Sequence, residues 1–379
     1  LELVQNGADA ILESHEAGTG QSGPARIEVV LANSSLYVAN TGAAFSEEGI
    51  DALLRSHSSP KRGNQIGRFG LGFKSLLRLG GKIDIVSGFV AFGFDPDRCR
   101  QELRERFSVK DAPGLRLAWL LDDAQAASLH DLFSWATTVV RAEIRGEDIL
   151  NHLRGEIQNF PSEFLLFLPV PVTLTLDDGA SGKRELHREP DGTDQLLHDG
   201  KNTSRWRVVE ERVSTDIRER NDATHIHARD SVPVSWAVPL DAKREEAGRF
   251  WAFFPTQTET RLPGILNAPW KLNSDRNAII GGEWNTALMR EAARLVAKTL
   301  PNLATSEDPG RPLDASLGSL TARMRMLHRL WRHCGLLSKM PRLFQMRREH
   351  RGLPAICVGI HGIAPTLPGD GKRWLVRKH

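Results

Sequence analysis

The chain opens with Leu1-Glu2-Leu3-Val4-Gln5-Asn6-Gly7-Ala8-Asp9-Ala10, and this stretch decides the fold that the sequence predicts. As a helix it places Glu2, Asn6 and Asp9 on one stripe, because residues three and four positions apart share a helix face. Two carboxylates and an amide on one face suit a magnesium-phosphate site. The side-chain oxygen of Asn6 can bind a hard cation, and Glu2 can orient or deprotonate a water that attacks a phosphate. The alternative is a solvated polar helix face.

Length and composition predict a globular protein with more than one domain. The 379 residues are 40% hydrophobic and 26% charged, and they suffice for two or three domains. Cys99, Cys334 and Cys357 are odd in number and far apart, which argues against a disulfide framework or a zinc motif and favours the cytoplasm. No apolar run reaches membrane-spanning length, and no basic-then-apolar leader opens the sequence. Because Leu1 lies inside the predicted helix, we expect a further segment to precede it.

Charge is spread unevenly along the chain. The net charge is +3, but residues 311–379 contain 14 Lys and Arg against 3 Asp and Glu, which gives this segment +11 and leaves residues 1–310 at −8. A basic segment predicts an acidic partner, nucleic acid included. It equally fits a helical tail that docks on an acidic domain of the same chain.

A second motif follows the first helix. Residues 27–31 and 35–39 are strand-like and flank a short turn, which predicts a hairpin. Its second strand leads into Asn40-Thr41-Gly42-Ala43-Ala44, and a helix with Ser46 as its N-cap is expected up to residue 54. Asn40 offers a side-chain oxygen to a ligand; the alternative is that it only caps the turn after the strand.

A third motif is glycine-rich: Ile66-Gly67-Arg68-Phe69-Gly70-Leu71-Gly72-Phe73-Lys74-Ser75. Glycines with this spacing at the start of a helix let backbone N–H groups approach an anion, and Lys74 adds a positive charge there. The stretch does not follow a strand directly, so it is neither a dinucleotide-binding turn nor a Walker loop. Residues 57–65 before it have no periodicity and predict a loop.

The rest of the sequence predicts strands and helices in two groups. A turn-rich connection is expected at residues 177–202, and a linker at 301–312. The expected strands are 82–86, 89–94, 116–120, 138–144, 163–169 and 172–176 before the connection, then 204–209, 232–239 and 250–255. The expected helices are 95–107, 147–158, 284–300 and 320–334.

In this order the three motifs resemble those of the Bergerat-fold ATPases, the superfamily of DNA gyrase, the ninety-kilodalton heat-shock chaperones, histidine kinases and the mismatch-repair protein MutL. The glycine-rich stretch is most similar to the heat-shock-chaperone and sacsin-like branch. The resemblance covers residues 1–176 and implies a two-layer α/β sandwich that binds ATP and magnesium. The chain departs from the family pattern at two positions of the second motif: Asn40 stands where the family has an Asp, and Ala44 where it has a second Gly. The Asn oxygen can still accept from an adenine amino group, but the charge is gone.

The resemblance also implies a role for individual residues. Glu2 would be the general base, Asn6 the magnesium ligand and Asp9 a pocket residue near the nucleotide. The other nucleotide-binding residues would be Asn40 and Gly42 in the adenine box, Lys61 in a lid over ATP, Gly67, Phe69, Gly70, Leu71, Gly72, Phe73 and Lys74 at the phosphates, and Thr137 or Thr138 beside the adenine.

A later stretch, Leu272-Asn273-Ser274-Asp275-Arg276, resembles a loop in the middle domain of the heat-shock chaperones and in sacsin repeats. That loop carries an arginine towards the terminal phosphate. An arginine from a neighbouring domain stabilises charge that develops on the transferred phosphoryl group, and it makes hydrolysis depend on domain docking. Arg276 is the first candidate and Lys271 the second. The alternative is that Arg276 only pairs with Asp275 or another nearby carboxylate.

The sequence therefore predicts a cytoplasmic ATPase of sacsin and heat-shock-chaperone type, acting as a chaperone or clamp. We expect an ATP-binding two-layer α/β sandwich at residues 1–178, a middle, transducer-like α/β domain at 179–305 and a basic helical region at 306–379. Expected partners are a second copy, through lid and domain closure, and a protein client or acidic partner of the basic region. The alternatives are a nucleotide-binding scaffold that does not hydrolyse ATP and a DNA- or RNA-linked clamp in bacterial defence. A histidine kinase fits least, since no helix with a phospho-acceptor His precedes the nucleotide motifs in this sequence.

Overall fold

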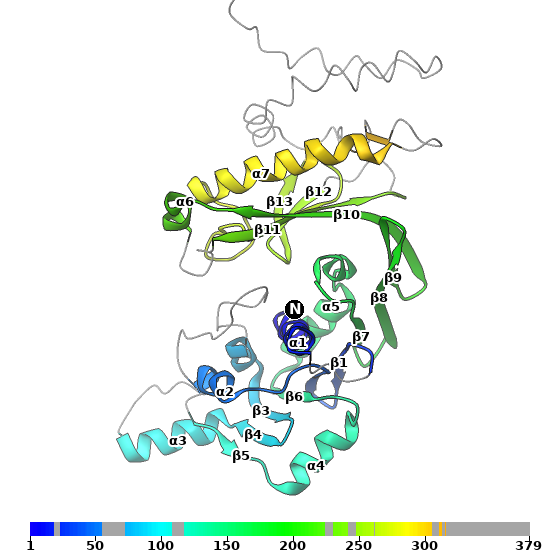
Figure 1. Ribbon diagram of the computed structural model, residues 1–379. Helices are drawn as coiled ribbons and strands as arrows, with labels where there is room; N and C mark the ends of the chain where they lie inside the picture. The colour runs from blue at the N-terminus through cyan, green and yellow to red at the C-terminus, as the bar shows by residue number, and fades with distance from the viewer. Residues whose placement is uncertain are drawn as a thin grey trace, which may run out of the picture. The chain divides into compact units, whose positions relative to one another are not determined.

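The computed structural model describes residues 1–18, 23–54, 73–107, 117–223, 230–241, 248–260, 262–304, 311–312 and 315. All of them belong to one compact unit within Leu1–Cys334. Their strands form a single 14-stranded mixed sheet in the order β13-β12-β14-β11-β10-β9-β8-β7-β1-β2-β6-β3-β4-β5 (Figure 1). One hydrogen-bonded ladder therefore connects strands from both groups that the sequence predicted.

The strands of this sheet pair antiparallel except at two places. β1 pairs in parallel with β7, and β12 with β14. The strands are β1 (Arg26–Ala32), β2 (Ser35–Asn40), β3 (Gly80–Ser87), β4 (Val90–Phe94), β5 (Trp119–Leu120), β6 (Thr138–Ile144), β7 (Thr173–Asp177), β8 (Lys183–Asp191), β9 (Asp194–Asp199), β10 (Asn202–Ser214), β11 (Ser231–Pro239), β12 (Gly248–Trp251), β13 (Pro255–Thr260) and β14 (Ile265–Asn267).

The helices are few by comparison with the strands. The α-helices are α1 (Glu2–Glu16), α2 (Glu47–Leu54), α3 (Pro96–Phe107), α4 (Asp123–Leu132), α5 (Glu147–Gln158), α6 (Ile217–Asp222) and α7 (Glu283–Thr299). Three 3₁₀ segments complete the described elements: η1 (Phe73–Leu79), η2 (Ser162–Phe167) and η3 (Leu300–Leu303).

The predicted fold class is wrong. The sequence indicated a two-layer α/β sandwich, then a middle α/β domain and a helical C-terminal part, whereas one large mixed sheet dominates the described chain. The difference arises at residues 177–202, which do not form a turn-rich connection. They form β8 and β9, whose pairings with β7 and β10 continue the sheet past the boundary expected at residue 178. The division into three domains stays a prediction, and residues 316–379 lie outside the described residues.

Most of the individual elements agree with the sequence. The hairpin is confirmed by the β1–β2 pairing, and Asn33 and Ser34 at its turn both have positive φ. Ser46 caps α2 as predicted, since its Oγ accepts a hydrogen bond from Gly49 N at 3.1 Å. The strand expected at residues 163–169 is wrong, because Ser162–Phe167 forms the 3₁₀ segment η2.

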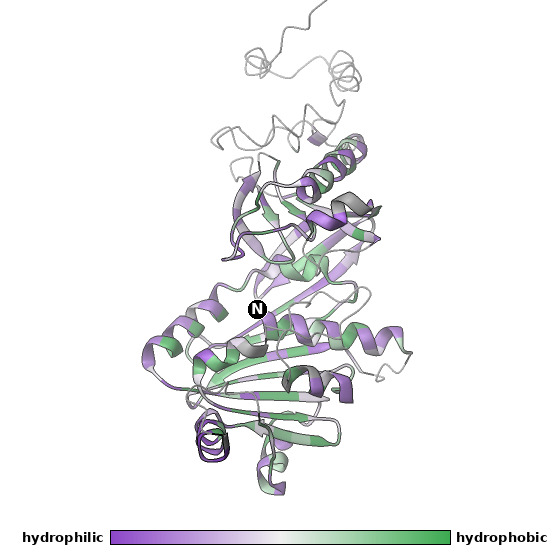
Figure 2. Ribbon diagram, turned by 90° about the vertical axis from the view of Figure 1, so that its left-hand side faces the viewer, coloured by the Kyte–Doolittle hydropathy of each residue, from purple (hydrophilic) through white to green (hydrophobic). Residues whose placement is uncertain are grey.

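Helices cover both faces of the β1–β2–β6–β3 part of the sheet. Val4, Ala8 and Ile11 of α1 pack in one core with Val38 of β2 and Val140 of β6. On the opposite face, Leu129 of α4 and Phe133 just after it pack against Ala39 and Val139. Alternate residues of one strand thus face α1 and α4. In Figure 2, where N marks the start of α1, the strands below that helix are mostly hydrophobic.

A second core forms around α7. Trp284 and Leu288 of this helix pack with Trp236 and Val234 of β11 and with Trp270, and all five side chains are almost fully buried. Asp222 at the end of α6 connects this core to the loop before α7. Its Oδ1 accepts a hydrogen bond from Lys271 Nζ at 2.8 Å, and its Oδ2 accepts one from Trp284 N, in the first turn of α7, at 3.0 Å.

The Asp222 contacts predict a pH dependence of stability. The hydrogen bond from Lys271, and then that from the Trp284 backbone, hold the pKa of the Asp222 carboxyl below its usual range. A lowered pKa stabilises the folded state above the unfolded value of about 3.9, and this stabilisation is lost as pH falls through the folded pKa. Asp222→Asn should lower the free energy of unfolding by about 1 kcal/mol at pH 7.

Urea unfolding at pH 7 and below pH 4 would check this. The difference in free energy of unfolding between Asp222→Asn and the wild type should be smaller at the lower pH. Asp123 is exposed, and the control Asp123→Asn should match the wild type at both pH values. An Asp222→Asn deficit of the same size at both pH values would contradict the pKa argument.

Candidate functional site

Three polar side chains form a row across adjacent strands beneath α1. Asn40 pairs with Thr138 across β2 and β6, and Thr138 pairs with Ser87 across β6 and β3. They are 6%, 5% and 2% exposed. Thr138 Oγ1 and Ser87 Oγ are 2.7 Å apart, and Phe45 N donates to Ser87 Oγ at 2.9 Å. Each residue lies two positions from a core residue on the α1 face, so the row faces α1.

The side-chain amide of Asn40 has a fixed orientation. Its Nδ2 donates to Thr41 O at 2.6 Å, and its Oδ1 accepts no hydrogen bond from the described residues. The backbone O of Asn40 accepts from Thr137 N at 3.0 Å. Asn40 therefore has a structural role at the strand end, and it also keeps an acceptor oxygen on the α1 face.

Glycines bring α1 close to this row. A Cβ at Gly7 would lie 3.2 Å from Asn40 Cβ, so the helix packs closely over Asn40 at this position. Gly42 has φ +110°, and a Cβ there would lie 2.6 Å from the backbone C of Ala10. Ala43 N also donates to Ala10 O at 2.9 Å. The segment after β2 is thus joined to the backbone of α1.

The predicted stripe on α1 is not a solvated face. Asp9 is 2% exposed, and Glu2 and Asn6 are half-buried. Asn6 and Asp9 each have a partner in the structure. Asp9 therefore belongs to the interior beside the sheet, whereas Glu2 and Asn6 are partly exposed.

The structure brings Glu2 and Arg276 together. Arg276 Nη1 donates to Glu2 Oε1 at 3.2 Å, although the two residues are 274 positions apart. The side chains are 38% and 35% exposed. Both were predicted as catalytic residues from separate motifs. The alternative was a local pairing of Arg276 with Asp275 or another nearby carboxylate, whereas the carboxylate of this contact comes from α1.

The backbone around Arg276 is held by side-chain hydrogen bonds. Arg276 has φ +56°, a left-handed conformation that non-glycine residues rarely adopt. Asn273 Oδ1 accepts from Asn277 N at 3.0 Å and from Ala278 N at 3.1 Å, and Arg276 N donates to Asn273 O at 3.0 Å. The surrounding structure therefore imposes this conformation, as is common where strain serves a function.

Asn285 of α7 fixes the base of the same loop. This residue is 3% exposed. Its Oδ1 accepts from Lys271 N at 2.8 Å, and its Nδ2 donates to Lys271 O at 2.7 Å and to Ile280 O at 2.8 Å. One amide thus joins the two ends of the loop that carries Arg276.

Asn285→Ala should therefore lower the free energy of unfolding by about 2–3 kcal/mol, because it removes the partners of the part-buried Lys271 N and Ile280 O. Urea unfolding would measure this. Asn302→Ala is the control, since Asn302 is exposed and its amide makes one long hydrogen bond of 3.4 Å. Equal stability of the two variants would contradict the role given to Asn285.

Lys271, the second catalytic candidate, lies elsewhere in this network. Its Nζ donates to Asp222 O at 2.6 Å and to Asp222 Oδ1 at 2.8 Å. The ammonium group therefore contributes to the start of α7, and Arg276 is the cation of this loop that reaches α1.

The remaining nucleotide-binding candidates are not all described. Lys61, Gly67, Phe69, Gly70, Leu71 and Gly72 lie outside the described residues. Phe73 and Lys74 begin η1, but the structure does not describe their side chains. These predictions about the lid and the phosphate turn stay predictions.

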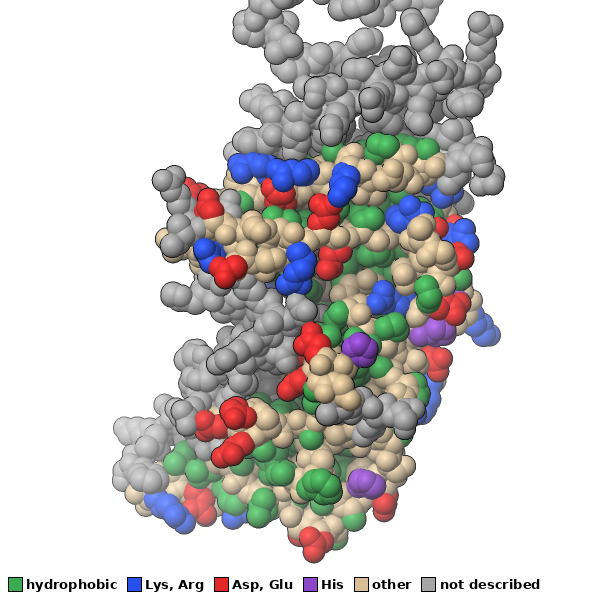
Figure 3. Space-filling view, viewed as in Figure 1, with side chains coloured by type: hydrophobic (Ala, Val, Ile, Leu, Met, Phe, Trp, Pro, Cys, Tyr) green, Lys and Arg blue, Asp and Glu red, His purple; other side chains and the backbone are tan. Residues whose placement is uncertain are grey.

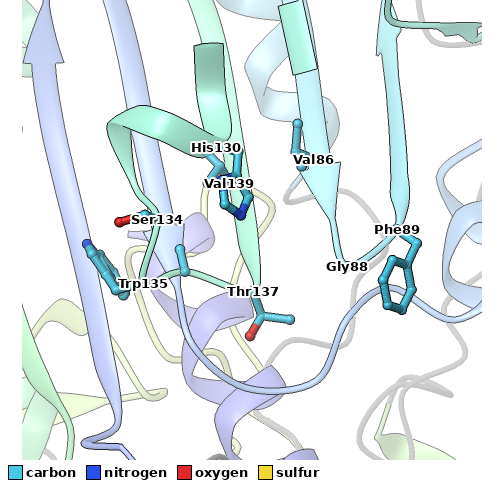
Figure 4. Close-up of a pocket in the computed structure, with 9 residues that line it drawn as sticks. Val86, Gly88, Phe89, His130, Ser134, Trp135, Thr137 and Val139 are labelled. Carbon is cyan, nitrogen blue, oxygen red and sulfur yellow. The ribbon is translucent and has the colours of Figure 1, made fainter. Parts of the chain in front are cut away.

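Thr137 lies away from Thr138, on the other face of the sheet. It lines a pocket of about 480 Å³ together with Val86, Gly88, Phe89, His130, Ser134, Trp135, Ala136 and Val139. Figure 4 shows Trp135 and Phe89 at opposite ends of this pocket. Since successive strand residues point to opposite faces, Thr138 and not Thr137 belongs with Asn40.

The described ranges contain neither a metal-binding cluster nor a membrane-spanning helix. Within those ranges, no group of three or more His, Cys, Asp and Glu side chains is arranged to hold a metal ion. A magnesium ion held by Asn6 and phosphate oxygens would not require such a group. No helix in the same part of the chain is both long and apolar enough to span a bilayer.

Sequence reasoning missed three residues of the site. Ser87 ends β3 without any distinctive pattern around it. Asn285 lies in the first turn of α7, where a polar residue is ordinary, and the motif of the arginine loop gave Asn273 no role of its own. A buried Asn that holds a loop gives no local sequence signal, because its partners are backbone atoms.

Comparison with known proteins gives one weak relationship. No family model matches the chain. Protein NO VEIN of Arabidopsis thaliana is 24% identical over 393 residues, a match that covers 99% of this chain and 13% of NO VEIN. The chain thus spans about 13% of the length of the curated relative it matches. The chain is similar to one section of a much longer protein, and this identity does not show a family.

Proposed function

We propose that this chain binds ATP with magnesium and hydrolyses it slowly, as a conformational switch of the sacsin and heat-shock-chaperone type. The observation that carries the proposal is the Glu2–Arg276 contact of 3.2 Å. A carboxylate and an arginine from distant segments can serve phosphoryl transfer to water, one by positioning the water and the other by stabilising the developing charge. The order of the motifs, which resembles that of the Bergerat ATPases, adds support.

Each residue would act through the group that the structure presents. Asn6, one turn after Glu2 on α1, would hold magnesium through its side-chain oxygen. The magnesium ion would neutralise phosphate charge. Glu2 would orient and deprotonate the attacking water, and Arg276 would stabilise the terminal phosphate. Asn40 would accept a hydrogen bond from the adenine amino group through Oδ1, beside Thr138.

The basic segment 311–379, on which the nucleic-acid clamp alternative depends, lies almost entirely outside the described residues. The lid that is expected to close in a dimer also lies outside them. On the face shown in Figure 3, positive and negative side chains are interspersed around α7 and β10, with ion pairs such as Lys298–Glu211. A chaperone or clamp role remains part of the proposal. A cytoplasmic location is also proposed, because the three cysteines do not have the pattern of a disulfide framework.

Glu2→Ala tests the proposed chemistry. The variant should release phosphate from ATP at least about 100-fold more slowly than the wild type, because a positioned base contributes a factor of this size. It should still bind ATP. Glu13→Ala, at an exposed position of the same helix, is the matched control. Unchanged turnover in Glu2→Ala would rule out the base, and wild-type protein that keeps ATP intact for hours would indicate a non-hydrolysing scaffold.

A further inference from the structure

We propose that the Glu2–Arg276 ion pair is a latch on the proposed catalytic site. Arg276 holds the carboxylate of Glu2 until the terminal phosphate of ATP takes its place as the partner of the guanidinium. Binding of ATP and release of the base are then one event. This inference rests on the proposed function and adds its regulation.

In this geometry, Glu2 and a terminal phosphate would compete for the guanidinium of Arg276. While Arg276 Nη1 donates to Glu2 Oε1, the guanidinium occupies one lone pair of that oxygen. A water cannot donate to the oxygen from the same direction. A general base must lie within hydrogen-bond reach of the proton it removes. The contact therefore engages one oxygen of the carboxylate that catalysis needs, and a phosphate that draws Arg276 away releases that oxygen.

The backbones on both sides of the contact are fixed, so the exchange involves side chains. α1 packs closely over Asn40 at Gly7 and is joined to Ala43 through Ala10 O. The arginine loop is held by Asn273 and by the buried amide of Asn285. Because Arg276 and Glu2 are 38% and 35% exposed, each side chain can turn towards a ligand without movement of its backbone.

Electrostatics favours the exchange. An ion pair with this degree of exposure is weak, since both groups remain partly hydrated. A guanidinium binds phosphate oxygens in a bidentate arrangement and through stronger, charge-assisted hydrogen bonds. The pair is thus strong enough to hold Glu2 in the absence of a terminal phosphate and weak enough to yield to one. A nucleoside diphosphate, which lacks that phosphate, should leave the pair intact.

Affinities for MgATP and MgADP would test the latch. Isothermal titration calorimetry is carried out on the wild type, Glu2→Gln, Arg276→Gln and the double variant. Glu2→Gln should bind MgATP about two- to fivefold more tightly than the wild type, the factor that an exposed ion pair is worth, with little change for MgADP. In the Arg276→Gln background the same Glu2→Gln change should give no such gain.

The double variant separates the latch from simple repulsion. If Glu2 only repels phosphate, its replacement tightens MgATP binding equally with and without Arg276, and the latch is overturned. Unchanged or weaker binding by Glu2→Gln overturns it as well. Glu13→Gln makes the same charge change on the same helix and should match the wild type. No MgATP binding by either the wild type or Glu2→Gln would overturn the proposed function together with the latch.

Discussion

Arg276→Ala is expected to lower the rate of ATP hydrolysis about 1,000-fold at saturating ATP. An arginine brought to the transferred phosphoryl group from another segment stabilises charge that is larger in the transition state than in the bound substrate. Its loss should therefore lower kcat more than it raises KM. Phosphate release measures this effect. Arg294→Ala removes an exposed arginine of α7 and should keep wild-type turnover.

The backbone conformation of Arg276 provides a second comparison. At φ +56° alanine keeps the strain of the left-handed region and glycine does not, so Arg276→Gly should be about 1 kcal/mol more stable than Arg276→Ala. Both variants should be equally slow. If Arg276→Gly kept most of the wild-type turnover, the guanidinium would have no part in the reaction.

Gly42→Ala is expected to lower the free energy of unfolding by about 3–5 kcal/mol. The position has φ +110°, and the new Cβ would lie 2.6 Å from Ala10 C and from Ile11 N, both backbone atoms that cannot move independently of α1. Backbone strain and overpacking each cost about 1–3 kcal/mol. Urea unfolding measures the loss.

Gly146→Ala is the matched control for Gly42→Ala. Gly146 has φ +116°, but a Cβ there meets nothing within 4 Å. Gly146→Ala should therefore lower the free energy of unfolding only by the backbone strain, about 1–2 kcal/mol. Equal losses at the two positions would show that α1 does not approach the chain at Gly42 as closely as described.

Local structure could be predicted where short-range rules decide it. The hairpin of β1 and β2 follows from strand-like residues around a turn, and β6 and α5 agree with the sequence at both ends. The segment of η2 could not be assigned in this way. Its apolar run, Phe164 to Leu168, is buried on all sides, and a short apolar run of this kind does not distinguish a strand from a helical turn.

The continuity of the sheet depends on long-range pairing that the sequence does not display. β8 and β9 are rich in charged residues. Two arginines of β8 donate hydrogen bonds to backbone carbonyl groups: Arg184 Nη2 to Phe160 O at 3.1 Å, and Arg188 Nη2 to Leu168 O at 2.6 Å. Such strands resemble a polar connection. The turn at Gly192 between them was the available signal for a hairpin. α4 was missed although Asp122 and Gln125 form a capping box, which is a recognised helix start.

The candidate site was predictable only in part. The spacing of Glu2, Asn6 and Asp9 indicated one helix face, and α1 has that form. The resemblance of its loop implied that Arg276 reaches towards a terminal phosphate. Its contact with Glu2 was not predicted, because no local pattern specifies a contact across 274 residues. Asn273 and Asn285 hold the loop of Arg276 through hydrogen bonds to backbone atoms, and the sequence does not show such contacts.

Calorimetric titration of the protein with ATP, with and without magnesium, measures binding at the nucleotide site proposed on α1. The wild type should bind ATP more tightly with magnesium, and Asn6→Ala should lose that magnesium dependence while it keeps the fold. No binding of ATP by the wild type under either condition, or a magnesium dependence that Asn6→Ala retains, would contradict the nucleotide site proposed on α1.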